Sequence, residues 1–269
     1  MKRAVRIIIL LFFFAFLAGT AIVMLRYAAR QQRTAVCGGE EIDIERGSFE
    51  IYLQNRDIEN WLARHEISIK GRKSEEVNAA HIERVLLKNP YVGGAQVFMT
   101  RDGVCHLEVE QRNPFLKVVA GNGMMFQIDR NGIEMPVNTD YAVRLRVASG
   151  YIPVTPKYGA DVTAIADTLR ASVLKRLYEI NVFLASDPFW DAMFEQIYVT
   201  YAGEYELIPK VGGQLVKLGK VADMADLADK LKRLDLFYRK GLNADGWEKY
   251  SVLNLKYANQ LVATKKTVF

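Results

Sequence analysis

The side chains able to do acid–base, nucleophilic or metal chemistry are few and scattered along this chain. His65, His81 and His106 form neither an HExxH motif nor a cysteine–histidine cluster with metal-ligand spacing. There is no GxSxG nucleophile motif and no GxxxxGK[ST] phosphate loop, and Gly121-Asn122-Gly123 is a lone G-x-G that reads better as a turn. The sequence therefore predicts no catalytic residue, no metal site and no cofactor.

Acidic residues occur in groups, but not in groups suited to catalysis. Glu40-Glu41 and Glu75-Glu76 are adjacent pairs, and neighbouring side chains on a helix or strand point apart, so they cannot flank one reacting bond. A row of three acids, Asp223, Asp226 and Asp229, lies in a predicted helix. Because Lys230, Lys232 and Arg233 are nearby, we interpret this row as a solvated face of the helix.

Cys37 and Cys105 are the chain's two cysteines. They could form a disulfide in an oxidising compartment, and two unpaired or buried thiols fit the sequence equally well. A zinc site would need about four clustered ligands, which this spacing does not provide.

The net charge of +5 is concentrated near the beginning of the chain. Residues 1–36 hold no acid and six basic residues: Lys2, Arg3, Arg6, Arg26, Arg30 and Arg33. The rest of the chain is close to neutral, so the basic surface that phosphate recognition needs is missing. We expect no nucleic-acid binding.

Residues 7–25 form an uncharged apolar stretch close to the ~20 residues that a helix needs to cross a bilayer. A cleaved signal peptide would have a shorter apolar region followed by a small-x-small site, whereas Arg26 and Tyr27 follow here. We predict an uncleaved transmembrane helix between a cytoplasmic tail, residues 1–6, and a linker, residues 26–36. Basic residues flank both ends almost equally, and the terminal amino group makes the short end slightly more cationic, which places the C-terminal bulk outside.

The next part of the chain predicts the order β-α-α-β-β. A short strand at 42–44 precedes a helix that Asp57 could cap, with an apolar stripe of Ile58, Trp61, Leu62 and His65. A second helix, with Ile82, Val85 and Leu86 on one face, ends at Asn89-Pro90. Alternating residues then predict strands at 92–100 and 104–110 around an Asp102-Gly103 turn.

Beyond Pro114 the pattern predicts a second, strand-rich domain. Strands are expected at 125–129, 144–148 and 215–218, a hairpin at 196–208, and helices at 161–187 and 222–240. Residues 250–264 alternate as one last strand, with Leu253, Leu255 and Tyr257 on one side and Asn254 and Lys256 on the other. Such a strand could lie at a sheet edge and pair with a partner strand.

The ordered set of motifs resembles the FtsQ/DivIB family, and the residues within the motifs are most similar to those of the Bacteroidetes branch. The matching residues cover most of the chain: Asn89-Pro-Tyr-Val92, Val109 to Pro114, Ile128-Asp129 through Gly132 to Met135-Pro136, Glu206 to Pro209, and Phe237-Tyr238 through Tyr250-Ser251 to Asn259-Gln260. The resemblance implies an α+β fold, with a POTRA domain at 37–114 and a mixed α/β domain with an antiparallel sheet at 115–269.

The resemblance also implies a function. It indicates a non-enzymatic divisome scaffold that links early and late division proteins and regulates septal peptidoglycan synthesis, without a small-molecule substrate. The implied partners are FtsB-like and FtsL-like proteins and the septal peptidoglycan synthase complex, and the implied location is the inner membrane at the septum.

The partner-binding residues implied by the resemblance lie in the last strand: Asn254, Leu255, Lys256, Tyr257, Asn259 and Gln260. The family's better-known branch has an Asp-Leu-Arg-Tyr pattern at the first four positions. In this chain Tyr257 keeps the tyrosine, Asn254 stands in place of the aspartate, and Lys256 stands in place of the arginine.

Two other functions remain open. A membrane-tethered envelope enzyme would need a cleft with a set of titratable groups, which the sequence does not offer. A POTRA-type chaperone for outer-membrane proteins would also add strands at an edge, but it normally has several repeats or a barrel.

Overall fold

The computed structural model describes residues 13–24, 26, 36–46, 52–73, 76–100, 102–164, 169–240 and 249–266. The chain divides into two compact units, and the change from one to the other falls between Gln111 and Arg112. A short earlier piece that includes Tyr52 belongs to the second unit.

Residues 13–24 are helical. Across the described ranges, none of the helices combines the length and the apolar character that crossing a bilayer requires. The predicted tail at 1–6, part of the predicted span at 7–25 and most of the predicted linker at 26–36 lie outside the described residues.

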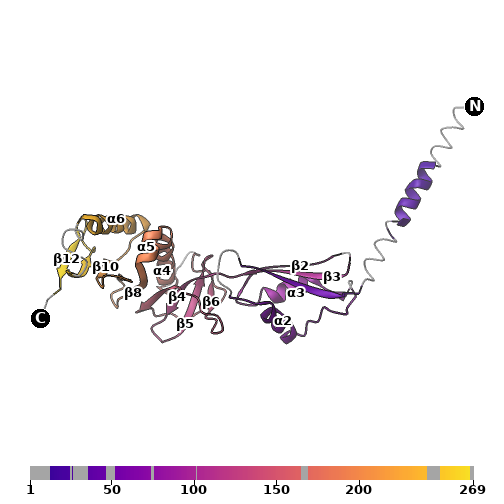
Figure 1. The fold of residues 1–269 in the computed structure, drawn as a ribbon, viewed down its shortest axis with the longest axis horizontal. Coiled ribbons are helices and arrows are strands. Elements are labelled where there is room, and N and C mark those ends of the chain that lie inside the picture. The colour runs from indigo at the N-terminus through magenta and orange to yellow at the C-terminus, as the bar shows by residue number, and fades with distance from the viewer. Residues whose placement is uncertain are drawn as a thin grey trace, which may run out of the picture. The chain divides into compact units, whose positions relative to one another are not determined.

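The first unit has the predicted β-α-α-β-β order. Its elements are β1 (Gly39–Glu45), α2 (Asn55–Arg64), α3 (Ala79–Leu86), β2 (Val92–Met99) and β3 (Val104–Gln111). The strand order is β1-β3-β2, with β1 parallel and β2 antiparallel to β3. Both helices lie on one face of this sheet (Figure 1). The core between them is apolar: Leu53, Ile58, Leu62, Ile82, Leu86, Val92, Leu107 and Val109 are buried.

Local sequence accounts for most of these boundaries. Gly103 takes φ +83° in the β2–β3 turn, a conformation that glycine adopts without steric cost. The predicted cap of α2 was wrong: Gln54 is the N-cap, and Asp57 is the third helical residue, whose carboxylate accepts a hydrogen bond from the Gln54 N–H at 2.9 Å. His65 is exposed at the end of α2 rather than in the apolar stripe, and its Nδ1 lies 2.8 Å from the Trp61 carbonyl oxygen.

The second unit is built on one large sheet. In the described part of the chain, nine strands join in the order β12-β11-β10-β9-β8-β7-β4-β5-β6. The strands are β4 (Pro114–Val119), β5 (Met125–Asp129), β6 (Glu134–Pro136), β7 (Arg146–Gly150), β8 (Phe194–Val199), β9 (Tyr205–Pro209), β10 (Leu215–Gly219), β11 (Tyr250–Asn254) and β12 (Val262–Lys265). The helices are α4 (Leu169–Ala185), α5 (Pro188–Met193) and α6 (Met224–Lys240).

The large sheet is mixed. The expected antiparallel pairing is confirmed, for example between β8 and β9 and between β4 and β5. Parallel pairs that the sequence analysis did not predict join β4 to β7, β7 to β8 and β10 to β11. Parallel neighbours need a crossover connection. Helices α4 and α5 lie between β7 and β8 in the chain, and α6 lies between β10 and β11.

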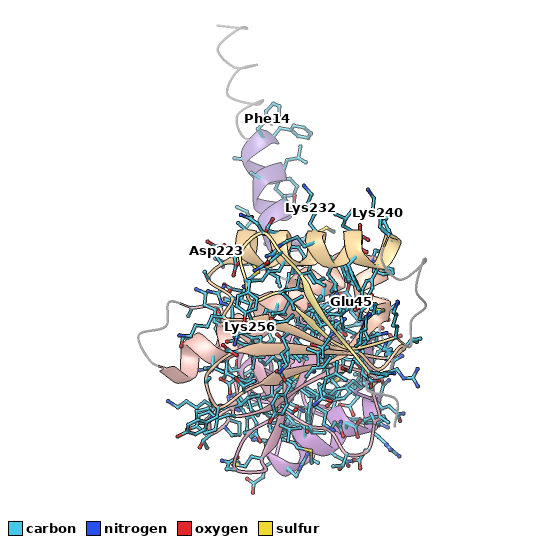
Figure 2. All side chains as sticks on the ribbon, turned by 90° about the vertical axis from the view of Figure 1, so that its left-hand side faces the viewer. Phe14, Glu45, Asp223, Lys232, Lys240 and Lys256 are labelled. Atoms are coloured by element: carbon cyan, nitrogen blue, oxygen red, sulfur yellow. The ribbon has the colours of Figure 1, made fainter. Side chains whose placement is uncertain are left out.

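The helices of this unit pack on the sheet through a large apolar core. Leu174, Leu177 and Ile180 of α4 and Leu227, Leu231 and Leu234 of α6 are buried against strand residues such as Leu207 and Val216. On α6, Lys232 and Lys240 point away from the sheet (Figure 2).

Arg146 of β7 ties the crossover to the sheet. Its guanidinium is buried and donates hydrogen bonds to the Asn181 side chain on α4, to the Asp191 carboxylate on α5 and to the Phe194 carbonyl. Burial lowers the pKa of Arg146, and the contacts with Asp191 oppose that shift. The guanidinium on β7 therefore holds α4, α5 and the first residue of β8 in place.

The prediction of a single strand over residues 250–264 was wrong. β11 and β12 are two antiparallel strands, with Leu253 opposite Ala263. Between them the chain turns, and Asn259 takes φ +60°, a left-handed conformation that asparagine tolerates better than most residues. The alternating residue pattern that predicted a strand continues through this turn. The pattern therefore does not reveal where the turn lies.

Candidate partner-binding edge

β12 lies at one end of the large sheet, and β11 is its neighbour on the inner side. The Lys266 N–H donates to the Lys249 carbonyl at 2.8 Å, and the Thr264 carbonyl accepts from the Ser251 hydroxyl at 3.3 Å, so both groups point toward β11. Backbone groups of alternate residues point to opposite sides of a strand. The N–H and C=O groups of Ala263 and Lys265 therefore point outward, where no described strand pairs with them.

The six residues expected to bind a partner lie at the end of β11 and in the turn that follows. Asn254 is the last residue of β11, and its side-chain oxygen accepts a hydrogen bond from the Lys256 N–H at 3.0 Å. Leu255 is fully buried, and its N–H donates to the Lys217 carbonyl of β10 at 2.8 Å. Both residues hold the turn on the sheet.

The remaining four of these residues are exposed in the turn: Lys256, Tyr257, Asn259 and Gln260. Tyr257 has 52% of its surface exposed, so it does not join Leu253 and Leu255 in the core. The aromatic ring is thus available on the surface beside the outer strand.

Lys256 already has an internal partner. Its ammonium lies 2.6 Å from the Glu204 carboxylate, and this hydrogen bond and charge contact raise the pKa of Lys256 above its ordinary value. The stem of the side chain lies over Gly219, where a Cβ atom would come within 2.7 Å of the Lys256 Cγ. Lys256 therefore attaches the turn to the β8–β9 connection and to the end of β10.

Arg233 of α6 is a residue that the sequence analysis missed. Its Nη1 donates to the carbonyl of Tyr257 at 2.8 Å and to the carbonyl of Gln260 at 2.6 Å, and its Nε lies 3.1 Å from the Asp229 carboxylate. The only signal in the sequence was the Asp229–Arg233 spacing, which is typical of an ordinary exposed helix pair.

The exposed side chains of β12 give the edge a basic and partly apolar character. Val262 has 43% of its surface exposed, and Thr264, Lys265 and Lys266 are also exposed. Lysines on an edge strand hinder uncontrolled pairing with other sheets and favour an acidic partner.

The other candidate groups do not assemble into a reaction site in the described part of the chain. No three His, Cys, Asp or Glu side chains there could hold a metal ion together. The acids at the start of α6 have structural contacts. Asp223, just before the helix, accepts from the Asp226 N–H, and Asp226 accepts from Lys230, which is buried rather than solvated.

Cys37 and Cys105 are both buried in the first unit as unpaired thiols. Burial, followed by the nearby Cys37 and Glu40, raises the pKa of the Cys105 thiol to about 11. A disulfide between them stays a prediction.

Comparisons with known proteins agree with this architecture. Residues 113–264 match a family model described as FtsQ/DivIB, C-terminal related, and residues 35–110 match a POTRA-like domain. The cell division protein FtsQ of Rhodothermus marinus is 25% identical over 198 residues, which cover 71% of this chain and 67% of that protein. With more than half of its length matched by the family model, the chain belongs to the FtsQ/DivIB family of cell division proteins.

Proposed function

We propose that this protein is a non-enzymatic scaffold of the divisome that binds partner proteins by adding a strand to β12. The observation that carries the proposal is the outward-facing backbone of Ala263 and Lys265 at the end of the large sheet. An extended peptide can pair with such groups, and the backbone hydrogen bonds then supply affinity while side chains supply specificity.

Tyr257 would anchor the added segment. Tyrosine offers a large and rigid contact with little loss of conformational entropy, and such residues often dominate binding energy at interfaces. Asn259 and Gln260 lie beside it in the turn, whereas Asn254, Leu255 and Lys256 would act by holding that turn in place. Family membership supports FtsB-like and FtsL-like proteins as the partners and the septal peptidoglycan synthase complex as the assembly that is regulated.

The proposed topology is that of a single-pass inner-membrane protein at the septum. Residues 1–6 would be cytoplasmic, 7–25 would span the bilayer, and the POTRA domain at 37–114 and the β-domain at 115–269 would lie in the periplasm. The apolar stretch before Arg26 supports this arrangement. The topology can be tested by attaching a fluorescent protein that fluoresces only in the cytoplasm to each end in turn. We expect fluorescence from the fusion at the N-terminus and none from the fusion at the C-terminus.

The partner-binding proposal can be tested by removing one outward-facing N–H. Lys265→Pro deletes that donor without removing a bond to β11, because proline is tolerated on an edge strand where its nitrogen faces outward. Full-length wild-type and variant proteins are purified in detergent, and the FtsB-like and FtsL-like proteins that copurify are quantified. We expect recovery of both partners to fall at least about tenfold for Lys265→Pro.

Lys265→Gln is the matched control, since it removes the same charge and keeps the N–H. Recovery close to wild type for Lys265→Gln, with a large loss for Lys265→Pro, supports strand addition. Equal recovery with the proline variant would contradict it. Deleting residues 250–269 would be a poor test, because the deletion also removes the buried Leu253 and Leu255.

A further inference from the structure

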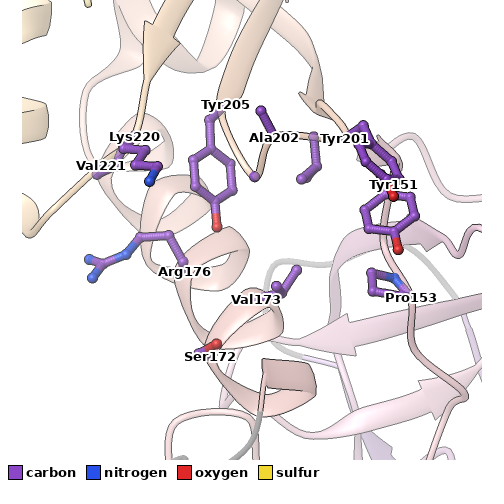
Figure 3. Close-up of a pocket in the computed structure, with 12 residues that line it drawn as sticks. Tyr151, Pro153, Ser172, Val173, Arg176, Tyr201, Ala202, Tyr205, Lys220 and Val221 are labelled. Atoms are coloured by element: carbon purple, nitrogen blue, oxygen red, sulfur yellow. The ribbon is translucent and has the colours of Figure 1, made fainter.

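A pocket of about 460 Å³ lies in the second unit, where strands β7 and β8 end beside α4 (Figure 3). These two strands are parallel. In open sheets with parallel strands, ligands bind outside the carboxyl ends of the strands. The pocket is lined by residues of four chain segments: Tyr151 and Pro153; Ser172, Val173 and Arg176; Val199, Tyr201, Ala202, Gly203 and Tyr205; and Lys220 and Val221.

Tyr205 places a polar group inside this pocket. The residue as a whole is only 7% exposed, and its hydroxyl points from β9 toward α4 (Figure 3). No described residue forms a hydrogen bond with that hydroxyl. Burial raises the pKa of Tyr205 to about 12, so the group stays protonated at neutral pH and can donate a hydrogen bond. The hydroxyl faces the pocket, where an acceptor on a bound ligand could receive its hydrogen bond.

The charges around the pocket favour an anion. Lys220 extends on the Tyr205 side of the pocket, and no described acidic group forms an ion pair with it (Figure 3). Arg176 lines the pocket with its stem, while its guanidinium donates to the Glu179 carboxylate at 2.9 Å and to the Ala222 carbonyl at 2.7 Å. With two cations and one acid, the local charge is positive.

The mouth of the pocket is aromatic. The rings of Tyr151 and Tyr201 lie 4.7 Å apart between centroids, and Tyr201 has 83% of its surface exposed. Pro153 adds another flat apolar surface. Aromatic grooves of this kind bind proline-containing or aromatic peptide segments, and tyrosine and arginine are enriched where proteins bind each other.

We propose that this pocket binds the C-terminal carboxylate of a partner protein, next to a proline or aromatic residue of that partner. The Tyr205 hydroxyl donates to the carboxylate, Lys220 pairs with its charge, and Tyr151, Pro153 and Tyr201 cover the neighbouring ring. This site is separate from the β12 edge and does not depend on strand addition there.

The test uses full-length protein in detergent and a matched pair of small probes. Acetyl-Pro-Phe with a free carboxylate and the same dipeptide as its amide are titrated by saturation-transfer NMR. We expect the acid to bind at least about tenfold more tightly than the amide, because a hydrogen bond to a charged acceptor is roughly twice as strong as a neutral one. Benzoate provides a third arm, since binding as tight as that of the dipeptide acid would indicate a site for free small acids and overturn the peptide assignment.

Two variants and two controls locate the binding. Tyr205→Phe keeps the ring and should weaken binding of the acid about tenfold. Lys220→Gln should weaken it several-fold and reduce its dependence on salt. Tyr198→Phe, on β8, and Lys210→Gln, after β9, remove the same groups outside the pocket and should bind like wild type.

The proposal is overturned if acid and amide bind equally, if neither binds, or if Tyr205→Phe and Lys220→Gln both bind the acid like wild type. Circular dichroism of each variant must match wild type, and a variant that fails this check is replaced by Tyr205→Leu or Lys220→Met. Because the β12 edge is unchanged in all of these proteins, recovery of the FtsB-like and FtsL-like partners provides a separate readout of the proposed function.

Discussion

The guanidinium of Arg233, on α6, donates a hydrogen bond to the backbone carbonyl of Gln260, at a distance of 2.6 Å and 27 residues further along the chain. The same nitrogen donates to the carbonyl of Tyr257. One side chain therefore fixes the turn that precedes β12, and it does so through backbone atoms, whatever side chains the turn carries.

Removing this contact should loosen the edge strand. We expect Arg233→Ala to destabilise the second unit by about 1–3 kcal/mol, since hydrogen bonds that involve a charged group contribute about 1.5–3 kcal/mol each. Hydrogen exchange followed by mass spectrometry should show faster exchange in residues 250–266. Arg239→Ala is the matched control, because Arg239 forms the same helix pair with Asp235 but is 76% exposed. Similar exchange for both variants would rule out the proposed role of Arg233.

Tyr257 should matter for binding and little for folding. Tyr257→Ala is expected to reduce partner recovery about tenfold and to change the free energy of unfolding by less than about 0.5 kcal/mol, because the side chain lies on the surface. Tyr158→Ala removes a tyrosine of nearly the same exposure elsewhere in the second unit, 53% against 52%, and should leave recovery unchanged. Copurification measures the first quantity and chemical denaturation the second. A purely structural Tyr257 would show the opposite pattern.

Asp226 should make stability depend on pH in the acid range. Burial alone would raise the pKa of Asp226, but hydrogen bonds from Lys230 and the Ala222 N–H, together with the charges of Lys230 and Arg233, lower it below 3.8. The folded state thus favours the ionised form, so this contribution is present above about pH 4 and is lost as the pH falls through the lowered pKa. Urea denaturation should show wild type more stable than Asp226→Asn at pH 7, with the difference vanishing once the pH lies well below the lowered pKa of Asp226. A difference that persists there would contradict this assignment.

Cys105 should be unreactive in the folded, reduced protein. The thiolate is the reactive form, and a pKa of about 11 leaves little of it at pH 8.5. We expect iodoacetamide to label Cys105 only after unfolding in guanidinium, as measured by peptide mass spectrometry. The raised pKa also means that the folded state favours the neutral thiol, so stability should fall as the pH rises from about 9 toward 11. Mapping without a reductant reports whether Cys37 and Cys105 pair.

Much of the fold follows from short-range patterns. The β2–β3 turn depends on Gly103 and the β8–β9 turn on Gly203, both with positive φ, and these glycines mark the hairpins in the sequence. The helical spacing of Val173, Leu177 and Ile180, with gaps of four and three residues, likewise identifies α4. Such features are readable because each is determined by neighbouring residues.

Other features depend on contacts between distant segments. No glycine or proline marks the turn between β11 and β12, which is held by Arg233 from another element. The parallel pairing of β7 with β8 joins strands separated by two helices, and no local pattern encodes it. The pocket around Tyr205 also combines residues from four segments, so the sequence could not predict it.

The parallel pairing of β10 with β11 has a consequence for how the chain matures. β10 meets β9 on one side, but its other side stays open until α6 has formed and Tyr250–Asn254 has been delivered beside it. A nascent chain that has emerged only as far as Lys240 therefore exposes an unpaired strand edge to its surroundings. The newly made protein should need protection from aggregation during that interval, and an assembly partner could recognise β12 only once synthesis and folding of this segment are finished.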